Sequence, residues 1–403
     1  MLNINRKDFA SLLIAFSFFQ FGILQPIAVL VHSQVVIAVA TIITVVLLLV
    51  VFQFRVRKYV FLLFAAISLL FLFSYLFYDS RDMTLFIYGE FLLKSFSLIL
   101  IGSFPFATDS LKKYFYLFSN VNFVALSFIL VSGQIEAIDY MRFGYALLPT
   151  LLVSLYLFKE GHKFFNAAII VSSFMMIFIY GSRGPLVGIA IFLLILLFIN
   201  KSMKIHIKIV AFLGLSLGFV YLFMMNGLIG ILDFIYFDLG FETYSIEKLR
   251  IMLLDGLAES SSGRDTLYSR FIQLFIDSPV VGNGIGVTNE LWEVTPHNLF
   301  LQILIEFGIV GVFTSIICAI PFLYFLLKIR RADNELFLMF SILFSVSFGR
   351  LLVSSDLWLR PEFWLFISMT INSYLLIKSR LRKKEKVSKV KYLVQTNSNF
   401  TTR

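Results

Sequence analysis

Apolar residues occur along most of this chain in runs of about twenty, and short polar segments separate the runs. A helix needs about 20 apolar residues to cross a bilayer, and inside the bilayer its backbone must satisfy its own hydrogen bonds. The runs therefore predict twelve membrane-spanning helices in one all-α integral membrane domain, residues 1–403. The twelve predicted spans are residues 9–31, 35–54, 59–78, 84–106, 114–132, 144–158, 164–180, 185–199, 207–228, 299–327, 336–353 and 363–377.

One long polar segment, residues 229–298, interrupts this pattern between the ninth and tenth predicted spans. It contains ten acidic residues but only four basic ones. Residues 246–257 and 265–276 carry apolar side chains at helical spacing, and a serine-rich stretch, 260–263, separates them. The pattern predicts two amphipathic helices on the membrane surface or over a cavity. We therefore expect a large, partly helical loop outside the membrane.

Composition and charge agree with a membrane protein and orient it. Of the 403 residues, 59% are hydrophobic and 14% charged, whereas soluble proteins have about 45–50% and 25%. Basic residues gather in alternate loops, so the positive-inside rule predicts cytoplasmic termini and an external 229–298 loop. The tail, residues 378–403, supplies +8 of the net charge of +10. Bases beside a membrane interact with anionic lipid headgroups, so no nucleic-acid partner is predicted.

Three arginines in predicted external segments are candidates for anion binding. Arg183 lies in a Gly-Ser-Arg-Gly hairpin, Arg264 directly precedes the second predicted amphipathic helix, and Arg270 lies within that helix. Each could instead have no function: Arg183 could be an incidental residue in a tight turn, and Arg264 could form a surface Arg–Asp pair, which contributes little to stability. Charges at the membrane edge are costly, however, and arginine binds phosphate through two parallel hydrogen bonds. Two arginines converging from different loops would suit a diphosphate.

Further candidates lie where the polar loop enters the tenth predicted span. His297 and Asn298 begin this span, and Glu306 lies inside it. A histidine is more often structural than catalytic, but one here could take a proton from a hydroxyl. A buried acid such as Glu306 needs a partner. Just before them, Gly-Asn-Gly-Ile-Gly at 282–286 follows no strand, so it predicts a loop with unusual backbone angles rather than a dinucleotide site.

Other kinds of site find little support. The four histidines are scattered and none has the spacing of a metal-ligand pair. The single cysteine can form neither an intramolecular disulfide nor a cysteine cluster. No Gly-x-Ser-x-Gly sequence indicates a serine hydrolase. Neither a metal centre nor a serine hydrolase site is therefore predicted.

The order of these motifs resembles that of the O-antigen ligase/polymerase superfamily. These bacterial membrane enzymes polymerise or transfer lipid-linked surface polysaccharide. The resemblance rests on GSRG at 181–184, SGRD at 262–265, GNGIG at 282–286 and PHNLFLQILIEFGIVG at 296–311. The last of these, in front of a predicted span, is the most specific.

The resemblance implies a membrane-embedded glycosyltransferase of the GT-C-like kind, in the bacterial inner membrane, with its active site facing the periplasm. The implied substrate is an oligosaccharide on undecaprenyl diphosphate, and a polysaccharide chain-length regulator is a candidate partner. Arg183 and Arg264 would hold the diphosphate, and His297 would activate the acceptor hydroxyl. Arg270, Asn298 and Glu306 are the further predicted substrate contacts. Because a diphosphate is a good leaving group, no metal and no other cofactor is expected.

Three functions fit these features. A polymerase of lipid-linked repeat units is favoured, because the chain is compact and GSRGPLVG resembles polymerases from polysaccharide gene clusters. A ligase that transfers polysaccharide to lipid A-core is the alternative. A transporter or flippase would also have about twelve spans, but its charges should lie near mid-membrane in both halves. Here the motif residues gather at one face, which favours an enzyme.

Overall fold

The structure is a computed structural model, and it describes residues 5–134, 138–158, 163–182, 184–199, 204, 206–207, 227–254, 264–354 and 356–400. This part of the chain is helical and contains no strand. Its first ten elements are α1 (Arg6–Leu30), α2 (Val35–Val51), α3 (Lys58–Phe77), α4 (Arg81–Phe91), the π-helical η1 (Leu92–Phe96), α5 (Ser97–Gly102), α6 (Thr108–Val131), α7 (Tyr140–Leu157), α8 (Lys163–Tyr180) and α9 (Gly184–Ile199). The rest are α11 (Gly227–Asp233), η3 (Phe234–Asp238), α12 (Tyr244–Leu254), α13 (Arg264–Asp277), α14 (Val287–Trp292), α15 (Leu299–Ala332), α16 (Asn334–Val353) and α17 (Pro361–Phe400).

These helices confirm an all-α polytopic membrane protein. Within the described ranges, eight segments are long and apolar enough to cross a membrane, with α4, η1 and α5 counted as one. The helices α2 and α9 are apolar but shorter, at 17 and 16 residues. The last predicted span, 363–377, forms the first part of α17. The ninth, 207–228, lies almost entirely outside the described residues, so the number twelve stays a prediction.

The interior of the body is built around α7, most of whose residues are buried. It packs against α1, α6, α8, α9 and α16. On the α6 side, Asn122 donates hydrogen bonds to the carbonyl of Ala146 at 2.8 Å and to Thr150 Oγ1 at 2.9 Å. By contrast, α2 and α3 carry many exposed apolar side chains, which suit contact with lipid tails.

A close crossing of α9 and α16 depends on two glycines. A Cβ on Gly349 would come within 2.7 Å of the Gly188 Cα, and a Cβ on Gly188 would lie 2.9 Å from the Ser345 carbonyl oxygen. Only residues without a side chain allow two helix backbones to approach this closely. The crossing fixes the end of α16 beside the start of α9, where the 181–184 hairpin ends.

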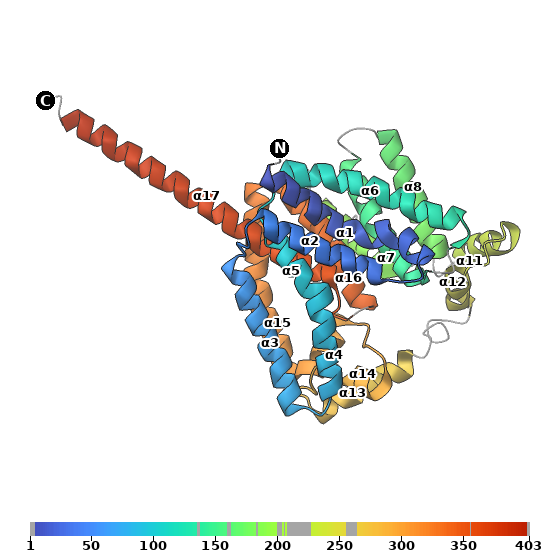
Figure 1. The fold of residues 1–403 in the computed structure, drawn as a ribbon. Coiled ribbons are helices and arrows are strands. Elements are labelled where there is room, and N and C mark those ends of the chain that lie inside the picture. The colour runs from blue at the N-terminus through green and yellow to red at the C-terminus, as the bar shows by residue number, and fades with distance from the viewer. Residues whose placement is uncertain are drawn as a thin grey trace.

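Figure 1 shows two further features of the arrangement. Helix α17 leaves the body as one long helix that carries the basic tail, and α13 and α14 lie across the ends of α3 and α4. The predicted amphipathic helices 246–257 and 265–276 correspond to α12 and α13, and residues 255–257 lie outside the described part. The predicted turn at 260–263 also lies outside it.

Candidate functional site

Helix α15 is broken one third of the way along, and the break organises the site. Gly308 has φ 61° and ψ −156°, which is not helical. The backbone groups freed by the break pair with the preceding loop: Asn283 N donates to the Ile305 carbonyl at 2.8 Å, and Ile309 N donates to the Pro279 carbonyl at 2.9 Å. A Cβ on Gly308 would lie 2.4 Å from the Val280 carbonyl oxygen. The predicted span 299–327 is therefore two helical segments joined at Gly308.

The glycine-rich loop before this span has the unusual backbone angles that its sequence predicts. Gly282, Gly284 and Gly286 have φ values of 75°, 86° and 82°, a region that favours glycine. The helices α3 and α4 hold the loop from the other side. Thr84 Oγ1 donates a hydrogen bond to the Ile285 carbonyl at 2.9 Å, and the Ile285 backbone N–H donates one to Ser74 Oγ at 2.8 Å. The loop is thus fixed between α15 and the α3–α4 hairpin.

His297 lies directly before α15 in a left-handed conformation, with φ 50°. Its Nδ1 is 3.2 Å from Thr295 Oγ1. Asn298 caps the helix, because its Oδ1 accepts hydrogen bonds from Phe300 N at 3.0 Å and Leu301 N at 3.1 Å. This cap fixes the first turn of the helix that follows His297. That His297 and Asn298 contact a substrate stays a prediction.

Glu306 is buried and accepts hydrogen bonds from three directions. Its Oε1 accepts from Gln302 Nε2 at 3.0 Å and from Gly286 N at 3.4 Å, and its Oε2 accepts from Trp358 Nε1 at 2.9 Å. Gln302 Nε2 also donates to Asp356 Oδ2 at 3.2 Å. Burial, the largest factor, raises the pKa of the Asp356 carboxyl. Glu306 therefore joins α15, the glycine-rich loop and the α16–α17 loop, and its contact with a substrate stays a prediction.

The hairpin after α8 is held by the first half of the long loop. Thr243 Oγ1 donates to the Ile179 carbonyl at 2.5 Å, and Ser245 Oγ donates to the Gly181 carbonyl. Below these contacts, Ile246 and Leu249 of α12 pack in an apolar cluster with Ile179. Arg183 itself lies outside the described residues, but Gly181 and Gly184 on either side of it contact Ser245 and Tyr145.

A cluster of charged and aromatic side chains lies against this hairpin, and no sequence motif assigned it a function. A Cβ on Gly184 would come within 2.0 Å of the Tyr145 hydroxyl oxygen, so the hairpin backbone lies directly on that ring. The guanidinium of Arg350, at the end of α16, lies 4.7 Å from the centre of the same ring. Arg350 Nη1 is 3.6 Å from Glu362 Oε1, on the first turn of α17. Arg360 completes the cluster.

The other two predicted arginines lie on α13. Helix α13 begins at Arg264, whose side chain lies outside the described part. Arg270 is exposed, and the next residue, Phe271, is buried against Trp292 with 5.6 Å between ring centres. The structure gives no distances that join Arg183, Arg264 and His297, so their convergence stays a prediction.

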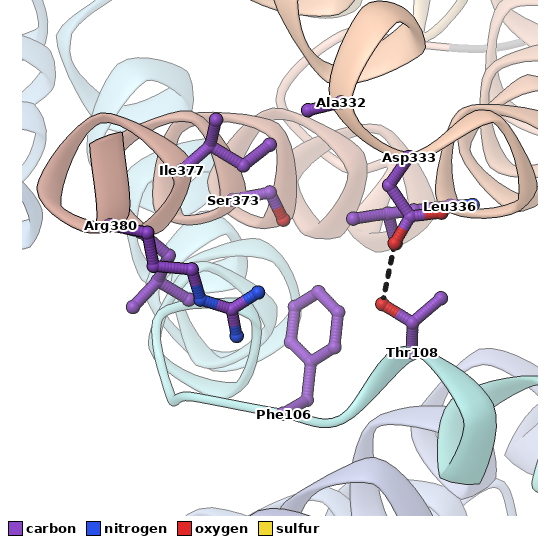
Figure 2. Close-up of a pocket in the computed structure, with 9 residues that line it drawn as sticks. Phe106, Thr108, Ala332, Asp333, Leu336, Ser373, Ile377 and Arg380 are labelled. Atoms are coloured by element: carbon purple, nitrogen blue, oxygen red, sulfur yellow. Dashed lines mark hydrogen bonds between the residues drawn. The ribbon is translucent and has the colours of Figure 1, made fainter. Parts of the chain in front are cut away.

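A separate pocket of about 310 Å³ lies at the other end of α16. Figure 2 shows Arg380 beside Phe106 and the 3.0 Å hydrogen bond from Thr108 Oγ1 to Asp333 Oδ2. The pocket residues Asp333 and Leu336 lie 17 and 14 residues before Arg350 along α16, which is about 21–26 Å along the helix. It therefore does not belong to the cluster around Tyr145.

Comparison with family models identifies the central part of the chain. Residues 168–316 match the family model described as O-antigen ligase. The match runs from α8 into α15, so it contains the hairpin, the long loop and the break at Gly308. No curated protein and no solved structure was found to match the chain.

Proposed function

Because residues 168–316 match the family model described as O-antigen ligase, we propose that this chain is a member of the O-antigen ligase/polymerase superfamily and that it polymerises oligosaccharide repeat units carried on undecaprenyl diphosphate. The reaction would take place at the periplasmic face of the bacterial inner membrane, and both termini would lie in the cytoplasm. One structural observation carries the proposal. A candidate base, His297, stands at a capped helix start, and the glycine-rich loop beside that helix is fixed by buried contacts.

In this reaction, a hydroxyl oxygen of the acceptor sugar attacks the anomeric carbon of the donor sugar. The new glycosidic bond forms as the bond from that carbon to the diphosphate oxygen breaks. Undecaprenyl diphosphate leaves with the electron pair, and Arg183 and Arg264 would stabilise the charge that develops on it. The acceptor proton would pass to His297.

The contact with Thr295 bears on how His297 would act. For Nε2 to accept a proton, Nδ1 must carry the ring hydrogen and donate it to Thr295 Oγ1, which lies 3.2 Å away. In that tautomer Thr295 would be a positioning residue for the base. Thr295→Val should therefore lower kcat more than it raises KM, whereas Thr295→Ser should keep most of the activity.

A ligase is the second candidate, because the matching family model is itself described as O-antigen ligase. A deletion strain separates the two functions through its lipopolysaccharide. Loss of the long polymer, with a single repeat still attached to lipid A-core, supports a polymerase. Loss of every attached repeat supports a ligase and contradicts polymerisation.

Transfer by purified protein tests the site. His297→Ala should reduce extension of a lipid-linked repeat by about 10²-fold or more, the usual scale for losing a general base. His32→Ala is a matched control, since His32 also has a left-handed backbone, with φ 49°, at a helix end. Arg183→Ala and Arg264→Ala should abolish transfer, and lysine should rescue poorly because it cannot form the bidentate contact. Wild-type rates in the His297→Ala variant would rule out the proposed base.

A further inference from the structure

Two arginines, Arg350 and Arg360, lie together beside the 181–184 hairpin, and of the two carboxylates near them only Glu362 is in ion-pair contact, with Arg350, within the described residues. Burial and then the charge of Arg350 lower the pKa of Arg360 to about 9. Two guanidinium groups close enough to repel each other in a desolvated region need a compensating anion. At neutral pH Arg360 therefore still carries its charge.

The protein groups nearby supply only part of that compensation. Glu362 is the single carboxylate that forms an ion pair with either arginine within the described residues, and its contact to Arg350 is long, at 3.6 Å. Asp356 is near enough to affect Arg360, but its oxygens accept hydrogen bonds from Gln302 and from Trp358 N. Arg360 makes no side-chain hydrogen bond in the part of the chain that the structure describes.

Several polar atoms of this cluster are buried and have no hydrogen-bond partner. They are Nε of Arg350, Nε of Arg360 and Oε2 of Glu362, and in the hairpin Oγ of Ser182 is likewise buried without a partner. Native proteins satisfy nearly all such atoms, and each exception calls for an explanation such as a ligand. The two arginine atoms are donors, so they fit a group rich in acceptor oxygens, whereas Oε2 of Glu362 is an acceptor that such a group would not satisfy.

The position of the cluster relates it to the donor-binding side of the site. Tyr145 touches both the hairpin, at Gly184, and the guanidinium of Arg350. Its hydroxyl also accepts a hydrogen bond from Ser354 Oγ at 2.7 Å. The Arg350 side chain is 14% exposed, which leaves it accessible to an anion at the helix ends. Arg183 lies in the same hairpin, between Ser182 and Gly184.

We propose that Arg350 and Arg360 bind phosphate oxygens of the lipid-linked donor, as a second anion site beside the 181–184 hairpin. The assignment of the anion to the donor rests on the proposed function. The anion site itself rests on the arrangement of the two arginines, Glu362 and Tyr145. Glu362 then limits the affinity of the site, because its carboxylate competes with the phosphate for Arg350.

Thermal unfolding of the detergent-solubilised full-length protein tests this site through ligand stabilisation. Inorganic pyrophosphate and undecaprenyl diphosphate should both stabilise the wild-type protein. Arg350→Gln and Arg360→Gln should weaken their apparent affinity by about tenfold or more, the scale of one lost charge-assisted hydrogen bond. Lysine at either position should retain part of the affinity. Arg142→Gln is the matched control, since Arg142 is an exposed arginine on the start of α7, and it should change nothing.

A variant with the opposite effect separates binding from loss of folding. Glu362→Gln removes the competing charge and should tighten pyrophosphate binding by on the order of fivefold. If the arginines only form a structural ion cluster, Glu362→Gln should not tighten binding, and that result would overturn the proposal. Unchanged pyrophosphate affinity in both arginine variants would overturn it as well.

The source of the phosphate is tested separately. If phosphatidylglycerol gives the arginine-dependent stabilisation and undecaprenyl diphosphate does not, the site binds lipid headgroups and the assignment to the donor is wrong. If the wild-type protein transfers sugar but its arginine variants bind undecaprenyl diphosphate normally, this proposal fails and the enzyme function stands. If the variants lose binding while the wild-type protein transfers no sugar, the anion site stands and the proposed function fails.

Discussion

Replacing Glu306 by glutamine would test the buried contacts that hold the site loops together. All three groups that point at its carboxylate are donors: Gly286 N, Gln302 Nε2 and Trp358 Nε1. A carboxylate only accepts, whereas the amide of a glutamine has one acceptor and one donor end. In Glu306→Gln, the NH₂ group must therefore face at least one donor.

The expected cost follows from these contacts. A hydrogen bond to a charged group contributes about 1.5–3 kcal/mol, and a buried donor left unpaired costs about 1–3 kcal/mol. We therefore expect Glu306→Gln to reduce the free energy of unfolding by about 3 kcal/mol. Gln302 cannot relieve the conflict by turning its amide, because its Oε1 accepts from Leu357 N at 3.0 Å.

A second substitution should remove the conflict. Trp358→Phe deletes the indole N–H that faces Oε2, so the NH₂ group of a glutamine at 306 could point there without meeting a donor. The double variant should then be more stable than the sum of the single effects predicts, with a coupling of about 2 kcal/mol. Trp364→Phe is the matched control, because the Trp364 indole donates to the Leu357 carbonyl at 3.0 Å instead.

Unfolding by sodium dodecyl sulfate in dodecyl maltoside micelles, followed by far-ultraviolet circular dichroism, measures these free energies. The pairing of Glu306→Gln with Trp364→Phe should be additive within about 0.5 kcal/mol. If the effects of Glu306→Gln and Trp358→Phe on the free energy of unfolding were additive, the reasoning would be refuted, because the hydrogen bond between these two residues would then not contribute to stability. A stability of Glu306→Gln equal to that of the wild-type protein would refute it too.

Three further predictions concern pH, the break in α15 and topology. The pKa of the Asp356 carboxyl is higher in the folded protein than its ordinary value of 3.8. As pH rises, the unfolded chain therefore loses the carboxyl proton first, and the free energy of unfolding should fall between the unfolded and the folded pKa. Asp356→Asn should reduce this pH dependence in unfolding measurements. Gly308→Ala should lower the free energy of unfolding by about 2 kcal/mol or more, because of the positive φ at this position and the nearby Val280 carbonyl. Gly89→Ala is the control: a Cβ there would meet open space, so it should not destabilise the protein. In a chain whose single cysteine is replaced by alanine, an impermeant thiol reagent should label Ser261→Cys in intact cells but not Ser388→Cys, and the reverse would contradict the predicted topology.

The helices themselves were largely predictable from the sequence. Predicted 164–180 corresponds to α8 (Lys163–Tyr180), and predicted 336–353 corresponds to α16 (Asn334–Val353). The reason is physical: hydrocarbon offers no partner for backbone N–H and C=O groups, so an apolar run of this length must be helical. The amphipathic helices of the loop were predictable for a similar reason, because one apolar face must be buried.

The break at Gly308 was not predictable from the same pattern. Apolar residues continue on both sides of it, so hydrophobicity alone predicts one helix. The break is possible only because residues 279–284 supply backbone partners for the carbonyls and N–H groups that it frees. The glycines at 282–286 indicated an irregular loop, but not that this loop would pair with the interior of a helix.

The charged cluster was harder to predict, because its members come from three separate segments. Tyr145 lies on α7, Arg350 on α16, and Arg360 in the loop before α17. In the sequence, Arg350 stands alone in an apolar run and Arg360 precedes a proline, so neither belongs to a recognisable motif. What joins them is the Gly188–Gly349 crossing, which fixes the end of α16 against the hairpin. A change that separates α9 from α16 at this crossing should therefore weaken anion binding without altering a charged residue, because the two arginines depend on helix packing for their position.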